Sequence, residues 1–413
     1  MRAGCVDLPS SRIPTTMPIA FHVILAPLVL AAAGPSAPAD TTPGYLGFGF
    51  ELLRQRLAAA PADNLSISPV SAGFALSVAA LGARGPTQSE MLRVLGFSGR
   101  SPAAVEQANQ QWIAALGGEK DVELEIANAL WVDQSQAVDS AYARRMAQAF
   151  RAEVAAAALR TPAGVELVNR WVAQHTHNRI QKILEQPRPN TAAFIANATY
   201  FKGKWATEFS KKATRPERFH ELGRSGRDVP TMHATIDAGY ARTGNVQLAR
   251  LPYRGGRFEM VIVLPDSNVP VGDVTKRLTD AAWQQWIGQT RSAELRLALP
   301  RFKLETSMSL RPDLEALGMK QAFDPERADL GAIFAAPVRR TFISDVVQKT
   351  WLAVDEEGTE AAAATGVTVG VTSARVDAPI PFVVNRPFIY ALRDAKTGLV
   401  LFVGVVQRIA DSG

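Results

Sequence analysis

The 413-residue sequence predicts one large α+β domain. Hydrophobic residues make up 47% of the chain, and no linker rich in Gly, Ser or Pro interrupts it after about residue 45. Helix-like and strand-like segments are mixed along the chain, without the regular β-α-β alternation that is typical of parallel sheets. One continuous core with mixed elements is typical of a single α+β domain.

Three segments are expected to be helical. The first begins at Ser68-Pro69, because a capping side chain followed by proline is a common helix start. No charged residue occurs from Pro69 to Ala83, so this helix should lie in the centre of the protein. Residues 139–158 and 165–184 have the pattern of amphipathic helices.

Five segments have the composition of strands. They are residues 123–132, 193–201, 258–265, 294–300 and 399–406. The last, LVLFVGVV, is apolar on both faces, so we expect a central and fully buried strand there.

The most unusual segment runs from Trp351 to Thr372 and reads WLAVDEEGTEAAAATGVTVGVT. If it were extended, one face would hold only small or β-branched, uncharged residues: Thr359, Ala361, Ala363, Thr365, Val367, Val369 and Val371. This pattern fits a strand with one buried face. The following SARVDAPIP contains prolines and is expected to be an exposed loop. The sequence therefore predicts a loop that is able to become a strand.

The usual motifs of enzymes are missing from the chain, which has no GxSxG, HExxH, Walker or GxGxxG string. His175 and His177 are two positions apart and could not face the same metal ion on a helix. Asp355, Glu356 and Glu357 are consecutive, so their carboxylates do not converge on one substrate atom. We therefore expect a protein that is not an enzyme, with no catalytic residue, no metal site and no cofactor.

The basic residues are dispersed. The net charge is +6, but the densest basic spots, such as Arg144-Arg145, are only pairs. Binding of nucleic acid needs a concentrated basic patch. We therefore expect no nucleic-acid partner.

Residues 1–39 are expected to be a secretory signal peptide. Residues 17–33 carry no formal charge, Arg2 and Arg12 precede them, and small residues follow. The apolar run is shorter than the roughly 20 residues that a membrane span needs. A signal anchor is the less favoured alternative, and translation could also begin at Met17. We expect a secreted or periplasmic protein with no membrane association after removal of the signal.

The only cysteine, Cys5, lies inside this expected signal peptide. The mature chain would therefore have no disulfide, no thiolate nucleophile and no cysteine metal ligand. A domain of this size can rely on its hydrophobic core instead.

Seven segments, in their order along the chain, are similar to segments of the serpin family. They are NLSISPVS (64–71), ALSVAALGARGPTQSEML (75–92), VNRWVAQHTHNRIQKIL (168–184), FIANATYFKGKW (194–205), VPTMHA (229–234), VDEEGTEAAAAT (354–365) and VNRPFIYALRDAKTGLVLFVGVV (384–406). One such string arises easily by chance, whereas seven in order are a strong match. The chain thus resembles a serpin of the bacterial type. The resemblance implies the serpin fold, with three β-sheets, about nine helices and an exposed reactive-centre loop at about 356–384, in a domain of residues 40–413.

The resemblance implies a serine protease inhibitor that acts once, as a suicide substrate. A target protease would cleave the loop and form an acyl-enzyme, and the freed loop would insert as a strand in the main sheet. The implied hinge positions are Glu356, Gly358, Thr359, Glu360, Ala361, Ala362, Ala363 and Ala364. Non-inhibitory serpins usually have charged or bulky residues at inward hinge positions, and this chain has none. A non-inhibitory serpin that serves as a protease substrate or binding module, and a cysteine protease inhibitor, are the alternatives.

Further family positions carry over one by one. Glu356 matches the glutamate at the base of the hinge, and Arg301 occupies the position of its basic partner. Trp205 matches the tryptophan at the upper gap where insertion begins. The polar cluster beneath the opening strands is matched by Ser68, Ser71, Asn197 and Gln348.

Gln348 departs from the family, because this position usually holds a histidine. An amide can donate and accept hydrogen bonds, but it does not titrate near pH 6–7. We therefore do not expect the pH-dependent opening described for other members. Residues 101–120, where some serpins carry a basic heparin-binding helix, contain a single lysine, so we expect no heparin site. We also expect the inhibitor to be a monomer.

Two counts place the scissile bond differently. Counting seventeen residues from Glu356, the usual family distance, gives Thr372–Ser373, which we favour because the alternating pattern ends there. Counting backwards from Asn385 gives a bond near Val376, after Arg375. A Thr372–Ser373 bait would suit elastase- or subtilisin-like proteases, whereas Arg375–Val376 would suit a trypsin-like protease.

Overall fold

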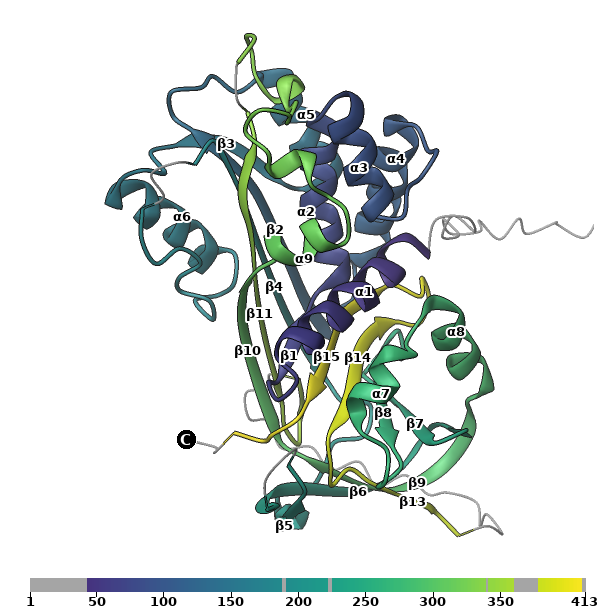
Figure 1. The fold of residues 1–413 in the computed structure, drawn as a ribbon. Coiled ribbons are helices and arrows are strands. Elements are labelled where there is room, and N and C mark those ends of the chain that lie inside the picture. The colour runs from purple at the N-terminus through teal and green to yellow at the C-terminus, as the bar shows by residue number, and fades with distance from the viewer. Residues whose placement is uncertain (1–42, 188–190, 222–224, 339–340, 360–377, 411–413) are drawn as a thin grey trace, which may run out of the picture. The chain divides into compact units, whose positions relative to one another are not determined.

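The apolar and alternating segments of the chain form the helices and strands of the structure (Figure 1). The computed structural model describes residues 43–187, 191–221, 225–338, 341–359 and 378–410. The α-helices in these ranges are α1 (Pro43–Ala59), α2 (Pro69–Gly82), α3 (Gly85–Val94), α4 (Pro102–Leu116), α5 (Ser140–Phe150), α6 (Pro162–Gln174), α7 (Val271–Lys276), α8 (Asp280–Gln289) and α9 (Arg311–Ala316). Of the helices in these ranges, none is long and apolar enough to cross a membrane.

The strands form two sheets. They are β1 (Leu65–Ile67), β2 (Val122–Asp133), β3 (Glu153–Ala157), β4 (Ala193–Lys204), β5 (Arg215–Phe219), β6 (Arg227–Thr243), β7 (Val246–Pro252), β8 (Phe258–Pro265), β9 (Arg291–Pro300), β10 (Phe302–Ser309), β11 (Ile343–Val354), β12 (Gly358–Thr359), β13 (Ile380–Val383), β14 (Phe388–Asp394) and β15 (Val400–Val406). One sheet has six strands and the other has nine.

The six-stranded sheet has the order β10-β11-β12-β4-β2-β3. Strands β11 and β4 also pair directly and in parallel, with Ile343–Trp351 beside Ala193–Tyr200. We call this pairing the seam. Beyond its end, the two-residue strand β12 lies between β11 and β4. The sheet is thus closed along the seam and carries a short extra strand at one end of it.

The nine-stranded sheet has the order β1-β15-β14-β8-β7-β6-β9-β13, with β5 beside β6. Strand β6 is 17 residues long and pairs in turn with β5, β9 and β7. Three sheets were expected, but β6 joins two of them into one, so the described strands form two sheets. Strand β15 lies between β1 and β14 and all of its residues are buried, which confirms the expected central strand. The α+β serpin fold is confirmed, with nine α-helices in the described ranges.

Helix α2 occupies the core, as its lack of charge predicts. All of its residues are buried. It contacts β2 and β4 of the six-stranded sheet and β15 of the other sheet. Its N-terminus, at Ser68, therefore reaches the seam from beneath.

Helix α6 covers the opposite face of the six-stranded sheet (Figure 1). Trp171 of α6 packs with Trp131 of β2, Phe194 of β4 and Val347 of β11 in a second core cluster. Side chains of a strand alternate between its faces, so neighbouring Ile195 of β4 joins the main core instead. The seam is therefore enclosed on both sides.

Two predicted helices are wrong in their extent. Residues 139–158 form α5 only to Phe150, because Arg151 adopts a left-handed conformation with φ 51 and the next residues pair with β2 as β3. Residues 165–184 form α6 only to Gln174, and His177 and Asn178 then adopt left-handed φ values of 48 and 61. In both places tertiary contacts outweigh a locally helical pattern.

Candidate functional site

The candidate site is the hinge, Asp355–Thr359, together with the seam below it. Strand β11 ends at Val354, and the chain turns back so that Thr359 pairs with Val354 on one side and with Gly203 of β4 on the other. The carboxylate of Asp355 shapes this turn, because its Oδ1 accepts hydrogen bonds from the amides of Glu357 at 2.9 Å and Gly358 at 3.2 Å. The chain leaving Thr359 thus starts from within the sheet.

Gly358 is required by a close approach of two backbones. A Cβ atom at this position would collide with the carbonyl oxygen of Gly203 on β4. Any larger residue would therefore push β12 away from β4. The glycine in EEGTE is explained by this contact.

Thr359 is fully buried, with 0% of its surface exposed. Its hydroxyl lies 2.6 Å from the hydroxyl of Tyr253. The Tyr253 ring stacks on Trp205 with centroids 4.5 Å apart, and the Trp205 indole donates to the carbonyl oxygen of Asp355 at 2.9 Å. The stacked rings of Tyr253 and Trp205 therefore bond to the hinge at both of its ends, Thr359 and Asp355. Burial also raises the pKa of Tyr253, so the phenol stays neutral.

Glu356 is 2% exposed and receives hydrogen bonds from Arg301 and Thr214. The bond from Arg301 Nε to its Oε1 is 2.8 Å long. Burial would raise the pKa of Glu356, but the bonds from Arg301 and Thr214 outweigh it and hold the pKa below its usual value. The structure thus brings together the glutamate and the arginine that the family resemblance pairs.

The carboxylate of Glu357, next to Glu356, pairs with a lysine at the surface. Glu357 accepts a bond of 2.6 Å from the ammonium of Lys211, whose own side chain is 59% exposed. The backbone oxygens of Glu356 and Glu357 also accept from the amides of Phe209 and Trp205. These contacts fasten the turn to the segment after β4.

The four residues expected in the polar cluster lie together beneath the seam. The Gln348 amide accepts from the backbone amide of Ser68 and donates to its carbonyl oxygen, both at 3.0 Å. The same amide nitrogen lies 2.6 Å from Oδ1 of Asn197, which in turn contacts Ser71 and, at 2.6 Å, Asn128 of β2. Strand β11 is therefore tied to α2 and β4 by one buried side chain.

Sequence reasoning missed several residues of the site. Asn128 and Tyr253 give no local signal, because their role depends on which strands are neighbours. The segment after α6 was expected to be helical, and it instead crosses the seam. His177 lies against the Tyr200 ring and pairs with Glu123 of β2 at 2.8 Å, while Arg179 lies 5.4 Å from the Trp351 ring centroid.

We call residues 176–180 the strap. Tyr200 and Trp351, which the strap contacts, are direct partners across the seam, with ring centroids 6.3 Å apart. Lys303 of β10 lies 5.8 Å from the same Trp351 ring. A strand that enters from the hinge must separate this pair and pass beneath the strap.

The remaining predicted positions lie outside the described residues. They are the hinge positions Glu360, Ala361, Ala362, Ala363 and Ala364, and the bait candidates Thr372, Ser373, Arg375 and Val376. Their roles stay predictions.

Comparison with known proteins gives the family. The chain matches the model described as serpin (serine protease inhibitor) over residues 44–409. It is 35% identical over 370 residues to Iripin-2 of Ixodes ricinus, covering 88% of this chain and 92% of that protein. It is 33% identical over 373 residues to Intracellular coagulation inhibitor 2 of Tachypleus tridentatus, covering 88% and 89%. The solved native structure of the thermophilic serpin tengpin matches with a TM-score of 0.84 and 28% identity, over 91% of this chain and 96% of that one.

The fold and the hinge define a protein in which the short strand β12 joins a sheet at the end of a closed seam. The chain belongs to the serpin family. It is therefore a serine protease inhibitor, whose partners are proteases, and not an enzyme. The mechanism is the general one of serpins, in which cleavage and acyl-enzyme formation are followed by loop insertion.

Proposed function

We propose that this inhibitor traps its target by inserting the chain after Thr359 between β4 and β11. The observation that supports this most is the position of β12, which pairs with both strands at the end of the seam. Thr359 sits there without charge and without exposure. A charged residue in its place would have to lose its hydration before insertion could begin.

The alternating pattern after Thr359 supplies the driving force for this proposal. Each new ladder hydrogen bond contributes about 0.5–1.5 kcal/mol net. Val367, Val369 and Val371 would each add about 1.5–3 kcal/mol if fully buried. These contributions sum to about ten kcal/mol or more, which is large beside the stability of most domains. Such a gain is sufficient to drag an attached protease and distort its active site.

We place the scissile bond at Thr372–Ser373, with Arg375–Val376 as the alternative. The strand pattern ends at Thr372, so a cut there would release a complete inserting arm. Its small, β-branched bait favours elastase- or subtilisin-like proteases, and a cut after Arg375 would favour a trypsin-like one. The shared step is attack by the serine of the target's own triad.

We also propose that residues 1–39 are a signal peptide and that the inhibitor, residues 40–413, is secreted or periplasmic and acts as a monomer. The supporting features are the uncharged run at 17–33 and the basic residues before it. N-terminal sequencing of the protein exported from its native host tests this proposal. A mature chain that begins before residue 30 would contradict it.

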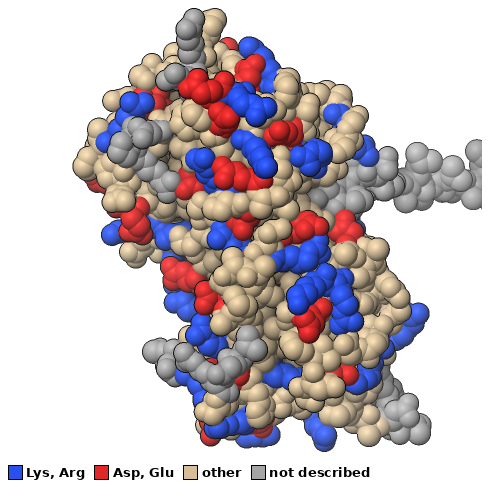
Figure 2. Space-filling view, in the orientation of Figure 1, with Lys and Arg blue, Asp and Glu red and all other residues tan. Residues whose placement is uncertain are grey.

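The face of the protein drawn in Figure 2 gives no support for binding of a polyanion or nucleic acid. Figure 2 shows Lys and Arg interspersed with Asp and Glu on the face drawn, without a concentrated basic area. We therefore propose inhibition that does not depend on heparin.

A protease panel tests the proposed target. The inhibitor is incubated with elastase-, subtilisin- and trypsin-like proteases, and complexes that resist SDS are sought by electrophoresis. Mass spectrometry of the released C-terminal peptide then gives the bond. A peptide starting at Ser373 supports the proposal, whereas one starting at Val376 assigns the bait to Arg375. Cleavage without any complex would show the non-inhibitory alternative.

A further inference from the structure

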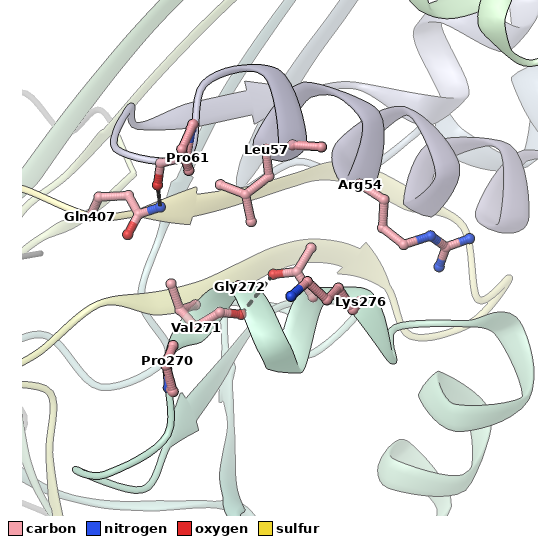
Figure 3. Close-up of a pocket in the computed structure, with 10 residues that line it drawn as sticks. Arg54, Leu57, Pro61, Pro270, Val271, Gly272, Lys276 and Gln407 are labelled. Carbon is pink, nitrogen blue, oxygen red and sulfur yellow. Dashed lines mark hydrogen bonds between the residues drawn. The ribbon is translucent and has the colours of Figure 1, made fainter.

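A cavity of about 290 Å³ lies between α1 and α7 (Figure 3), and none of its lining residues belongs to the hinge or the seam. Its walls are mainly apolar and include Leu57 and Ala58 of α1 and Val271 and Gly272 of α7. Its volume is at the lower end of the range of small-molecule pockets. A compact apolar body would therefore be accommodated.

One end of the cavity holds a buried hydrogen-bond acceptor. Gln407, which follows β15, is 1% exposed, and its Nε2 donates to the carbonyl oxygen of Pro61 at 2.6 Å. That oxygen can only accept, so the orientation of the amide is fixed. Within the described residues Oε1 has no hydrogen-bond partner. Figure 3 shows it directed away from Pro61, on the side of Val271.

The other end of the cavity carries two cations, each of which is paired with a carboxylate. Lys276 lines it and bonds to Asp273 at 2.9 Å, with 77% of its side chain exposed, so this end meets solvent. Arg54 also lines it, pairs with Glu51 and bonds to the carbonyl oxygen of Leu278. In Figure 3 Arg54 lies at the end opposite Gln407, and Lys276 lies between them. An unpaired buried acceptor is costly, and a donor that reaches it gains binding energy.

We propose that this cavity binds a small phenolic carboxylic acid or a molecule of the same pattern. The hydroxyl would donate to Gln407 Oε1, the ring would lie between Leu57 and Val271, and the carboxylate would face Lys276. The three features of the ligand follow from the buried acceptor, the apolar walls and the two cations at the opening. This inference is independent of the loop mechanism.

The probe is 3-(4-hydroxyphenyl)propionate, and its binding is measured by calorimetry and by the thermal midpoint of the intact inhibitor. The analogue 3-phenylpropionate has the same ring and acid but no hydroxyl. We expect the hydroxyl probe to bind about tenfold more tightly, as one good hydrogen bond allows. Equal affinity of the two compounds, or no saturable binding of either, overturns the proposal.

Two variants place the site. Gly272→Leu should abolish binding, because the nearest atom to a Cβ there is Leu57 Cδ2, 4.0 Å away across the cavity. Gly288→Leu is the matched control, since this α8 glycine is exposed with open space around it and should leave binding unchanged. Gln407→Met should remove the preference for the hydroxyl probe. Binding that survives Gly272→Leu, or a preference that survives Gln407→Met, places the ligand elsewhere and overturns the assignment.

Discussion

The hydroxyl groups of Thr359 and Tyr253 lie 2.6 Å apart in the hinge, at the end of its described residues. Thr359 is the last hinge residue that the structure describes, and it already occupies the inward face of β12. Its neighbours on both sides are backbone groups of β4 and β11. In the proposed insertion, the residues after Thr359 would therefore extend a strand that already begins in the sheet.

Replacing Thr359 by arginine should convert the inhibitor into a substrate. The guanidinium would have to enter a fully buried position, which slows insertion relative to hydrolysis of the acyl-enzyme. We expect the number of inhibitor molecules consumed per protease molecule to rise at least tenfold. Thr359→Ser, which keeps the hydroxyl near Tyr253, is the control and should stay close to wild type. An unchanged stoichiometry for Thr359→Arg would contradict the proposed insertion.

The ion pair of Glu356 should stabilise the protein at neutral pH and not in acid. Its pKa is lowered in the fold, so its contribution is present above the unfolded pKa of about 4.3 and is lost as pH falls through the folded pKa. Arg301 is 38% exposed, so we expect Glu356→Gln to cost only about 1–2 kcal/mol at pH 7. The thermal midpoint of the variant should lie below wild type at pH 7, and the gap should shrink toward pH 3.

Ionisation of the neighbouring Asp355 changes stability with pH in the opposite direction, in wild type and in the variant. Burial raises its pKa, so its ionisation costs stability as pH rises, with or without Glu356→Gln. Because the charge of Glu356 also contributes to this raised pKa, the difference between wild type and variant reports Glu356 together with its effect on Asp355. A gap that is constant from pH 7 to pH 3 would mean that the Arg301 bond contributes nothing through charge.

Gln348→His should introduce a pH dependence that the wild type lacks. Gln348 is 1% exposed and bonds to both backbone groups of Ser68 and to Asn197. An imidazole can titrate near pH 6–7, and its protonated form could no longer accept from the Ser68 amide. We expect thermal stability of the variant to fall between pH 7.5 and pH 5.5 more steeply than that of wild type. Parallel profiles for the two proteins would show that this position does not control the seam.

Weakening the strap should speed opening of the seam. Arg179 lies over Trp351, a contact worth about 0.5–1 kcal/mol, so Arg179→Gln should accelerate opening about two- to fivefold. The rate is measured with a synthetic peptide of residues 359–372 that anneals to the intact inhibitor. Lys182→Gln makes the same charge change at an exposed position nearby and should leave the rate unchanged. Equal rates for all three proteins would remove the strap from the mechanism.

Period and composition predict those parts of the fold that depend on local pattern. The uncharged run after Ser68 identifies the central helix α2, and LVLFVGVV identifies the buried strand β15. The family resemblance pairs Glu356 with Arg301, and the structure places them in contact. In these cases the residue types themselves restrict the environment, because an all-apolar segment can only be buried.

Strand register and contacts between segments far apart in the sequence could not be predicted from local pattern. Tyr200 and Trp351 are 151 positions apart, and only the parallel pairing of β4 with β11 makes them neighbours. The end of α6 depends on left-handed residues such as Asn178, whose backbone amide donates back to the carbonyl oxygen of Ala173 at 2.9 Å. Alanine-rich β3 has a helical pattern, and its pairing with β2 decides its structure.

Locking the seam with a disulfide tests the central claim most directly. Thr199 and Thr350 are direct partners across the seam and both are buried, and neighbouring strands lie close enough for a disulfide between them. Apart from Cys5, in the expected signal peptide, the chain has no other cysteine, so Thr199→Cys with Thr350→Cys would form one defined bridge. The two single-cysteine variants are the controls and should inhibit normally. If insertion between β4 and β11 traps the protease, the oxidised double variant is cleaved without forming an SDS-stable complex, and reduction restores inhibition. An oxidised protein that inhibits with wild-type stoichiometry would contradict the account.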